Sequence, residues 1–262
     1  MPDPVRLVVS GATGRMGATL ARLAAADARF RLVGGLDREE GTADGYPAVR
    51  SIDGAGDLLG GADAVIDFSA PPFLSRLVSE RAEELRGRAL VIGTTGFGAE
   101  EEQLIDVVAA HSPVLTAANF SVAVNLLLAL AANAARVLGA DYDIEIVEAH
   151  HRRKEDAPSG TALALGEAVA AARGLSLNDA RRDGRSGRPG ARTPGEIGFH
   201  AVRGGLLAGE HEVRFLGDLD QLTLVHRATD RALFAAGALR AAAWLAGRPA
   251  GRYTMRDVLG LD

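Results

Sequence analysis

The chain has 262 residues, of which 47% are hydrophobic, so it can bury the core of one large domain or of two modest ones. Its formal net charge of −5 argues against a general nucleic-acid binder, and an anionic ligand would have to be attracted by a local group of cations. The absence of cysteine excludes disulfides, thiolate nucleophiles and cysteine metal sites, and we expect no metal centre.

Targeting signals are not evident in the sequence. No run of apolar residues looks long enough to span a bilayer, and the N-terminal stretch MPDPVRLVVSGATG passes into a strand and a glycine turn without a cleavable signal pattern. We therefore expect a cytoplasmic protein with no membrane partner.

The first residues are typical of a dinucleotide-binding unit. Residues 5–10 form a short apolar strand, GATGRMG follows at 11–17, and an Ala/Leu-rich helix continues to about residue 26. In such a unit the glycines let the backbone approach a pyrophosphate at the helix N-terminus. The spacing is G-x-x-G-x-x-G rather than G-x-G-x-x-G, so a plain strand-to-helix turn is the structural alternative.

A second strand at 30–36 ends in Asp37 and Arg38, close to the expected position of the residue that contacts the adenosine ribose. Asp37 suits the 2′-hydroxyl of NADH, whereas Arg38 could pair with the 2′-phosphate of NADPH. The two signals oppose each other, and their similar magnitudes predict that NADH and NADPH are both used.

Three more strands, in ADAVIDFS, RALVIGTTGF and SPVLTAANF, alternate with helices that begin near residues 71 and 99. This alternation predicts an α/β fold with a parallel, doubly wound sheet, in which ligands bind at the carboxyl ends of the strands. Two turns fall at that edge and are candidate cofactor contacts: Gly93, Thr94 and Thr95 in the first, and Ala117, Ala118, Asn119 and Phe120 in the second.

The rest of the chain predicts a second, α+β domain with a mixed sheet. Ser121 begins a long apolar helix, and three segments between 197 and 229 have the pattern of sheet strands, whereas the Gly-, Arg- and Pro-rich stretch at 174–196 is typical of a mobile, solvated loop. The last helix and the tail are expected to return to the first domain. We therefore predict a dinucleotide-binding domain at 1–120 plus 231–262, and a substrate-binding and oligomerisation domain at 121–230.

The stretch EAHHRRKEDAPSGTA, residues 148–162, concentrates the chemistry of the chain. His150 and His151 fall where the strand DYDIEIVEA gives way to a loop, and residues 159–161 form the N-terminal cap of an Ala-rich helix, which is a ready site for a carboxylate or phosphate. A single histidine is more often structural, and an Arg-Arg-Lys run is more often a solvated face. Their combination within one short span predicts a functional site.

This string resembles the signature of the 4-hydroxy-tetrahydrodipicolinate reductase family, also called dihydrodipicolinate reductases. GATGRMG, VIDFS, GTTGF, ANFSVAVN, PGEIGFHAVRGG and YTMRDVLGL extend the resemblance over nearly the whole chain. The resemblance implies an NAD(P)H-dependent oxidoreductase of the diaminopimelate route to lysine, acting on a small cyclic dicarboxylate, and a homotetramer.

The resemblance also implies roles for individual residues. His150 corresponds to the proton donor/acceptor and Lys154 to a proton donor, while His151, Lys154, Gly160 and Thr161 bind the substrate. The implied dinucleotide contacts are Gly11, Ala12, Thr13, Gly14, Arg15, Met16, Asp37, Gly93, Thr94, Thr95, Ala117, Ala118, Asn119 and Phe120.

Two other functions compete with this interpretation. One is a non-catalytic NAD(P)-binding redox sensor, and the other is a dehydrogenase of the aspartate or homoserine type. Neither needs the His-His-x-x-Lys and Ser-Gly-Thr elements together, so the combined motif favours the reductase.

Overall fold

The computed structural model describes residues 3–261. The chain folds into two compact units, one comprising Met1–Val122 with Ala232–Asp262 and the other Ala123–Arg231. Each unit has its own sheet, so the two are described separately.

The first unit contains a parallel sheet in the order β12-β6-β5-β4-β1-β2-β3. From β3 to β6 the order is the doubly wound 3-2-1-4-5-6 arrangement, in which ligands bind where the order reverses, beside β1. The predicted fold class is thus confirmed. The strands are β1 (Val5–Ser10), β2 (Phe30–Leu36), β3 (Val49–Arg50), β4 (Ala64–Asp67), β5 (Ala89–Ile92), β6 (Pro113–Thr116) and β12 (Gly251–Tyr253).

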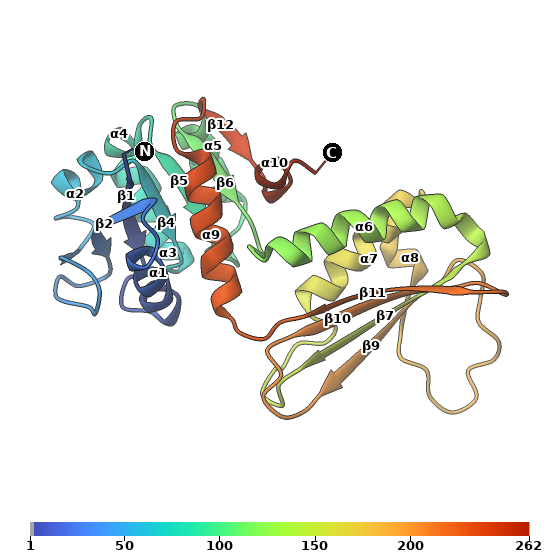
Figure 1. Ribbon diagram of the computed structural model, residues 1–262. Helices are drawn as coiled ribbons and strands as arrows, with labels where there is room; N and C mark the ends of the chain where they lie inside the picture. The colour runs from blue at the N-terminus through green and yellow to red at the C-terminus, as the bar shows by residue number, and fades with distance from the viewer. Residues whose placement is uncertain (1–2, 262) are drawn as a thin grey trace. The chain divides into compact units, whose positions relative to one another are not determined.

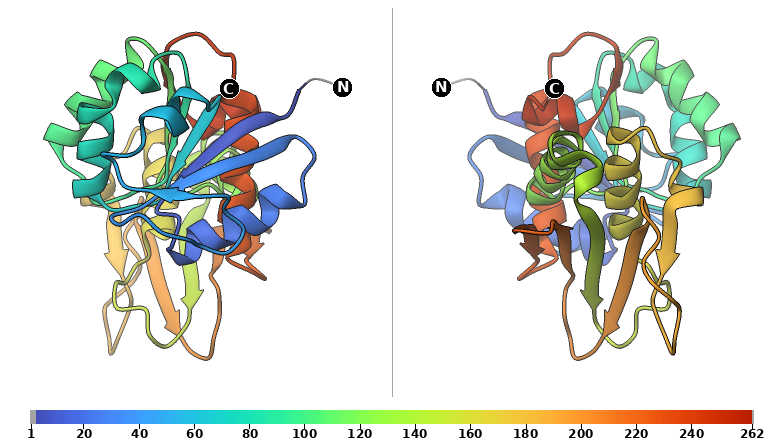
Figure 2. Two further views of the ribbon diagram at one scale, coloured as in Figure 1. Left: turned by 90° about the vertical axis from the view of Figure 1, so that its left-hand side faces the viewer. Right: turned by 90° about the vertical axis from the view of Figure 1, so that its right-hand side faces the viewer.

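Helices cover both faces of this sheet, which is why its central strands are apolar throughout. In β1, Leu7 and Val9 belong to the core under α1 and α9, whereas Val8 belongs to the core under α3 and α5. The left-hand view of Figure 2 shows α3 and α5 on one side of the strands and the red α9 on the other. The helices are α1 (Arg15–Ala25), α2 (Gly56–Gly60), α3 (Pro71–Glu80), α4 (Ala82–Leu85), α5 (Ala99–Ala109), α9 (Ala232–Leu245) and α10 (Met255–Leu259).

The second unit contains a mixed sheet in the order β11-β10-β7-β9-β8, as the sequence predicts. Strands β10 and β11 pair antiparallel, and β7, β9 and β8 pair parallel. The strands are β7 (Asp143–His150), β8 (Arg181–Asp183), β9 (Ile197–Arg203), β10 (Glu210–Leu216) and β11 (Gln221–Arg227). Helices α6 (Val122–Leu138), α7 (Gly160–Ala172) and α8 (Leu177–Ala180) lie on one face of it (Figure 1).

Side-chain alternation gives this sheet one buried face and one open face. Ile146, Phe199 and Val213 point to the helices and are fully or almost fully buried. On the open face Val202 and Val225 are 49% and 44% exposed. The helix-covered face therefore carries the core of the unit, and apolar side chains also remain on the uncovered face.

The expectation that no apolar run could span a bilayer was wrong. Within the described residues, the helical stretch Val122–Asp141 is long and apolar enough by length and composition. Leu127, Ala131 and Ala135 of this stretch are buried against the sheet, so the helix contributes to the core of the second unit. An alanine-rich helix that packs along one stripe satisfies the same composition test as a membrane span.

The Arg-rich stretch 174–196 is more ordered than the sequence predicts. It contains α8 and β8, and β8 pairs with β9. Arg185 and Arg192 then hydrogen-bond the carboxylate of Glu145 at 2.9–3.1 Å. Partial burial raises the pKa of Glu145, but hydrogen bonds from Arg185, His200 and Arg192 outweigh it and lower that pKa to about 2.

Candidate active site

The glycine-rich turn of the first unit leaves β1 and enters α1. Gly11 has φ +78°, and a Cβ there would lie 2.5 Å from the carbonyl oxygen of Phe68. A Cβ at Gly17 would lie 2.4 Å from the carbonyl oxygens of Gly11 and Ala12, so this glycine lets α1 pack closely on the turn. Both positions therefore require glycine for the tight turn between strand and helix. Thr13, Gly14 and Arg15 at the start of α1 are exposed, so an anion can reach the N-terminus of this helix.

A cavity of about 320 Å³ adjoins this turn at the carboxyl ends of the strands. A second cavity of about 380 Å³ shares three of its lining residues, Thr13, Asp37 and Arg38. Together they provide a concave surface beside a helix N-terminus, which suits the pyrophosphate and adenosine parts of a dinucleotide. The first cavity is lined by Gly11, Thr13, Gly14, Asp37, Arg38, Phe68, Ser69, Ala70 and Phe73.

Asp37 is held at the rim of these cavities by the turn itself. Its carboxylate accepts hydrogen bonds from the Thr13 N–H at 2.9 Å, the Thr13 hydroxyl at 2.7 Å and the Arg38 N–H at 2.8 Å. Partial burial raises the pKa of Asp37, but these hydrogen bonds bring it below its usual range, so the group stays ionised. The side chain of Arg38 is exposed beside it.

The turn after β5 is organised by a buried carboxylate that sequence reasoning missed. Asp67, fully buried at the end of β4, accepts hydrogen bonds from the hydroxyls of Ser10 and Ser69 at 2.6 Å and of Thr94 at 2.5 Å. Burial raises the pKa of Asp67. An acidic residue inside the apolar run AVID was the available signal. Because the Thr94 hydroxyl binds Asp67, we expect Thr94 to contact a cofactor through its backbone.

The remaining predicted contacts follow β6 and differ in exposure. Phe120 is 2% exposed, and its ring packs 5.6 Å from that of Phe68, so its side chain belongs to the core. The Asn119 side-chain oxygen accepts a hydrogen bond from the Ser121 N–H at 2.8 Å. Contact between the cofactor and residues 93–95 or 117–120 stays a prediction.

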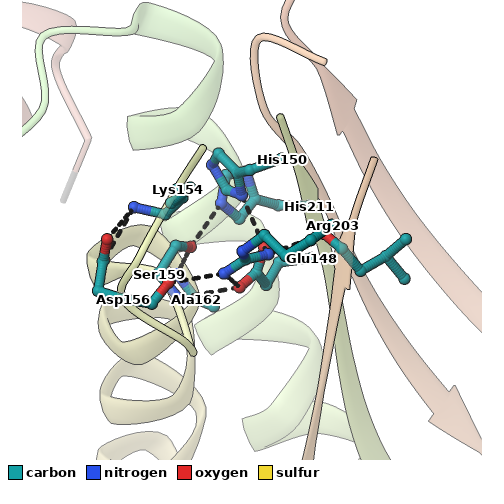
Figure 3. A network of polar contacts seen from close by, with 9 residues as sticks. Glu148, His150, Lys154, Asp156, Ser159, Ala162, Arg203 and His211 are labelled. Atoms are coloured by element: carbon teal, nitrogen blue, oxygen red, sulfur yellow. Dashed lines mark hydrogen bonds and ion pairs between the residues drawn. The ribbon is translucent and has the colours of Figure 1, made fainter. Parts of the chain in front are cut away.

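In the second unit, strand register brings five polar side chains to one end of the helix-covered face. Glu148 and His150 are two residues apart in β7 and so point to the same side. His150 pairs with Arg203 of β9, Glu148 pairs with His211 of β10, and His211 pairs with His226 of β11. Figure 3 shows His150, Glu148, Arg203 and His211 gathered in this way.

Glu148 is the centre of this cluster. It is 1% exposed, and its carboxylate accepts hydrogen bonds from His150 Nδ1 at 2.6 Å, from both terminal nitrogens of Arg203 at 2.7 Å and from the Ser159 N–H at 3.1 Å. Burial raises the pKa of Glu148, but the contacts with Arg203 and His150 lower it below its usual range. The carboxylate is therefore an ionised acceptor.

His150, the predicted proton donor/acceptor, is largely buried, with 12% of its side chain exposed. Burial lowers the pKa of His150, the Glu148 carboxylate opposes this, and Lys154 and Arg203 lower it further. The imidazole is therefore mainly neutral at neutral pH, and it can take up a proton and release it again.

Lys154 and His151 lie in the loop after β7. The ammonium of Lys154 contacts both carboxylate oxygens of Asp156 at 2.8 Å, and Asp156 is itself 64% exposed. His151 has a buried Nδ1 atom with no hydrogen-bond partner among the described residues. An anionic ligand could therefore replace Asp156 at the ammonium of Lys154, and the buried Nδ1 atom of His151 could form a hydrogen bond with a ligand.

Helix α7 begins one residue after its cap. Ser159 is the N-cap, with its hydroxyl accepting from the Ala162 N–H at 3.2 Å, whereas Gly160 and Thr161 are the first residues of the helix. The prediction of a three-residue cap was therefore too broad. Gly160 is exposed, and no atom of the described part of the chain lies within 4 Å of a Cβ built on it, so a ligand can approach the start of this helix.

His211 was not predicted. It is 4% exposed, its Nε2 lies 3.0 Å from the Ser159 hydroxyl, and its ring centroid lies 5.2 Å from that of His150. Burial, followed by His150 and His226, lowers the pKa of His211 to about 4. The signal available in sequence was a histidine at an inward-facing position of GEHEV, two residues from Val213.

The first unit has a doubly wound sheet, a glycine turn and a carboxylate, Asp37, at the position expected for ribose contact. The same chain carries histidines and a lysine close to a helix N-terminus. This combination is typical of NAD(P)-binding oxidoreductases. The comparison with family models gives a narrower result. The model described as dihydrodipicolinate reductase, N-terminus, matches residues 5–120, and the one described as dihydrodipicolinate reductase, C-terminus, matches residues 123–259. The chain belongs to the dihydrodipicolinate reductase family.

Individual relatives agree with this assignment. The 4-hydroxy-tetrahydrodipicolinate reductases of Anaeromyxobacter sp. and Bradyrhizobium diazoefficiens are 48% and 46% identical, each over 98% of this chain and 98% of the relative. A solved structure of dipicolinate-bound dihydrodipicolinate reductase from Paenisporosarcina sp. shares the fold, with a TM-score of 0.75 and 22% identity over 96% of this chain and 97% of that one.

The buried His211 predicts a loss of stability in acid. Its pKa is lowered from 6.5 to about 4 in the folded chain, so as the pH falls the unfolded chain takes up the proton first. Above about pH 6.5 the neutral His211 does not lower the free energy of unfolding. As the pH falls towards 4, the free energy of unfolding decreases by up to about 3 kcal/mol because of this group. We expect His211→Gln to flatten the pH dependence of the free energy of unfolding in this window, measured by urea denaturation. Equal slopes in the two proteins would contradict this.

Proposed function

We propose that the chain reduces 4-hydroxy-tetrahydrodipicolinate to tetrahydrodipicolinate, using NADH or NADPH, in the diaminopimelate route of lysine biosynthesis. The observation that carries the proposal is the full-length identity of 48% and 46% to reductases of this name. The clustering of His150, Lys154 and the start of α7 in one unit supports it.

The substrate is a small cyclic dicarboxylate, and the second unit offers suitable partners for it. We propose that one carboxylate binds the backbone N–H groups of Gly160 and Thr161, where the dipole of α7 favours an anion. A second anionic group would replace Asp156 at the ammonium of Lys154, with His151 as a further hydrogen-bond partner. The dipicolinate in the Paenisporosarcina relative is a ligand of this class and supports the proposal.

The reaction takes up a hydride and a proton and releases water. A nicotinamide cofactor supplies the hydride when it is bound, and residues 11–16 with Asp37 and Arg38 are proposed to hold it. The protein must then deliver a proton to the negative charge that builds on the conjugated ring. His150 and Lys154 are the proposed donors, because both are partly buried side chains that carry an exchangeable proton beside the start of α7.

The first test is turnover. We expect nicotinamide absorbance to fall when the protein meets enzymatically generated hydroxytetrahydrodipicolinate, and His150→Gln to lower kcat by about a hundredfold or more, because acid–base help is lost. Dinucleotide affinity should stay normal. Lys154→Ala is the comparison variant and should also raise KM, because it removes an anion partner. No turnover by the unmodified protein would instead favour the redox-sensor alternative.

The second test is cofactor choice. A charge-assisted contact from Arg38 to a 2′-phosphate is worth about 1.5–3 kcal/mol, enough to offset repulsion by Asp37 at an exposed rim. We expect kcat/KM values for NADH and NADPH within about tenfold, a difference of roughly 1.4 kcal/mol. Arg38→Ala should shift the preference to NADH. Asp37→Asn, which retains an acceptor for Thr13, should shift it to NADPH. If both variants changed the ratio of kcat/KM for NADH and NADPH in the same direction, these roles would be contradicted.

The third test is assembly. We propose a homotetramer, supported by the family resemblance and by the apolar side chains on the open face of the second sheet, Val202 and Val225. Light scattering at micromolar concentration should give four times the chain mass of 27.2 kDa, and a monomeric mass would contradict the proposal. A cytoplasmic location without membrane or nucleic-acid partners stays a prediction.

A further inference from the structure

We infer that Glu148 and Arg203 are positioning residues: they keep one proton on Nδ1 of His150, so that the exchange of a second proton takes place at the outer nitrogen, Nε2. The inference rests on the proposed role of His150 in the reduction. Neither residue would touch the reacting atoms. Glu148 would fix the tautomer and orientation of the imidazole, and Arg203 would hold Glu148 in place.

The first argument is the saturation of the Glu148 carboxylate. One oxygen accepts from His150 Nδ1 at 2.6 Å and from Arg203 at 2.7 Å, while the other accepts from Arg203 at 2.7 Å and from the Ser159 N–H at 3.1 Å. An ionised carboxylate can only accept, so the Nδ1 atom of His150 must be the donor. The neutral ring therefore carries its proton on Nδ1, and Nε2 is the atom that gains or loses a proton.

The second argument is the position of this charge in the strand. Ile144 and Ile146 precede Glu148 on the same face of β7, and both are fully buried in the core. An apolar residue at 148 would continue that pattern without the cost of burying a charge. A buried ion pair is weak evidence for stability, because desolvation offsets the attraction. Glu148 interrupts the apolar pattern of β7 next to the proposed proton donor His150, and a role in function explains this better than a role in stability.

The third argument is the space around the imidazole. Gly209, just before β10, has φ +145°, and a Cβ built there would lie 3.1 Å from His150 Nε2. The glycine therefore leaves room beside the outer nitrogen, while Glu148 occupies the inner one. Glu148 thus binds one ring nitrogen, and residue 209 places no side chain against the other, as a proton-exchanging imidazole requires.

The charges around His150 set the sign of the expected effects. Glu148 stabilises the imidazolium, whereas Lys154 and Arg203 destabilise it, and His211 and His226 lie on the neighbouring strands β10 and β11. Removing the carboxylate must lower the pKa of His150, and removing the guanidinium must raise it. Charges this close shift the pKa of His150 whatever the role of the network, so the loss of kcat is the result that separates a positioning role from a structural one.

The experiment measures the pKa of His150 by NMR in the unmodified protein, Glu148→Gln and Arg203→Gln, with the signal assigned from His150→Gln. We expect a decrease in Glu148→Gln and an increase in Arg203→Gln. If His150 is the acid, activity falls as the pH rises through its pKa, so this limb of the kcat profile should move to lower pH in Glu148→Gln. The kcat maximum should fall at least about tenfold, as expected when an orienting carboxylate is lost.

Two further variants separate positioning from folding. Glu148→Asp keeps the charge and should keep the pKa of His150 closer to that of the unmodified protein than Glu148→Gln does. Glu145→Gln is the matched control, since Glu145 is on the same strand and also binds a histidine and arginine, here two arginines rather than one, but on the open face. It should lower stability and leave the pKa of His150 unchanged. If Glu148→Gln does not fold, Glu148→Asp and Arg203→Gln carry the test.

The outcomes distinguish this inference from the proposed function. An unchanged pKa of His150 in both Glu148→Gln and Arg203→Gln, shifts of the same sign, or an unchanged kcat maximum in Glu148→Gln would overturn the inference. Normal turnover in His150→Gln would overturn the role of His150 in the reaction and with it the positioning role, whatever the NMR result. Absence of turnover in the unmodified protein contradicts the proposed function and removes the reaction that the positioning would serve, whereas the NMR comparison still decides whether Glu148 and Arg203 set the pKa of His150.

Discussion

The second unit depends on one buried carboxylate. Glu148 joins the end of β7 to Arg203 of β9, to Ser159 at the start of α7 and to His150, and it is only 1% exposed. A buried charge is tolerated only when its hydrogen bonds are complete, so these elements must be correctly placed together. The same contacts that make the charge tolerable bring the imidazole and the helix N-terminus into one site.

The first unit has a buried carboxylate of a different kind. Asp67 accepts hydrogen bonds from the hydroxyl groups of Ser10, Ser69 and Thr94, and among residues 3–261 no cation is hydrogen-bonded to it, so burial raises its pKa. Glu148 has Arg203, and its pKa is lowered. The two acids therefore have different roles. Asp67 connects the ends of β1, β4 and β5 at the carboxyl edge of the sheet, whereas Glu148 keeps a negative charge beside the titratable ring of His150.

Much of the fold followed from local patterns. The strands at 5–10 and 30–36 have the predicted bounds, and the glycine turn, the alternating order of strands and helices and the mixed sheet are confirmed. Short elements such as β3 and α8 were missed, because a few residues carry too little periodicity. The Arg-rich stretch was misjudged, because Arg185 and Arg192 bind Glu145, which lies 40 or more residues away in the chain.

The sequence by itself determined the dinucleotide-binding turn and the candidate residues His150, Lys154, Gly160 and Thr161, since a glycine turn, a strand end and a helix start are encoded within a few neighbouring residues. Only the tertiary structure decided their partners. Arg203 is 55 residues from Glu148, and His211 is 52 residues from Ser159. Strand register brings these groups together, and it is set by the burial of one whole face of the sheet rather than by any local motif.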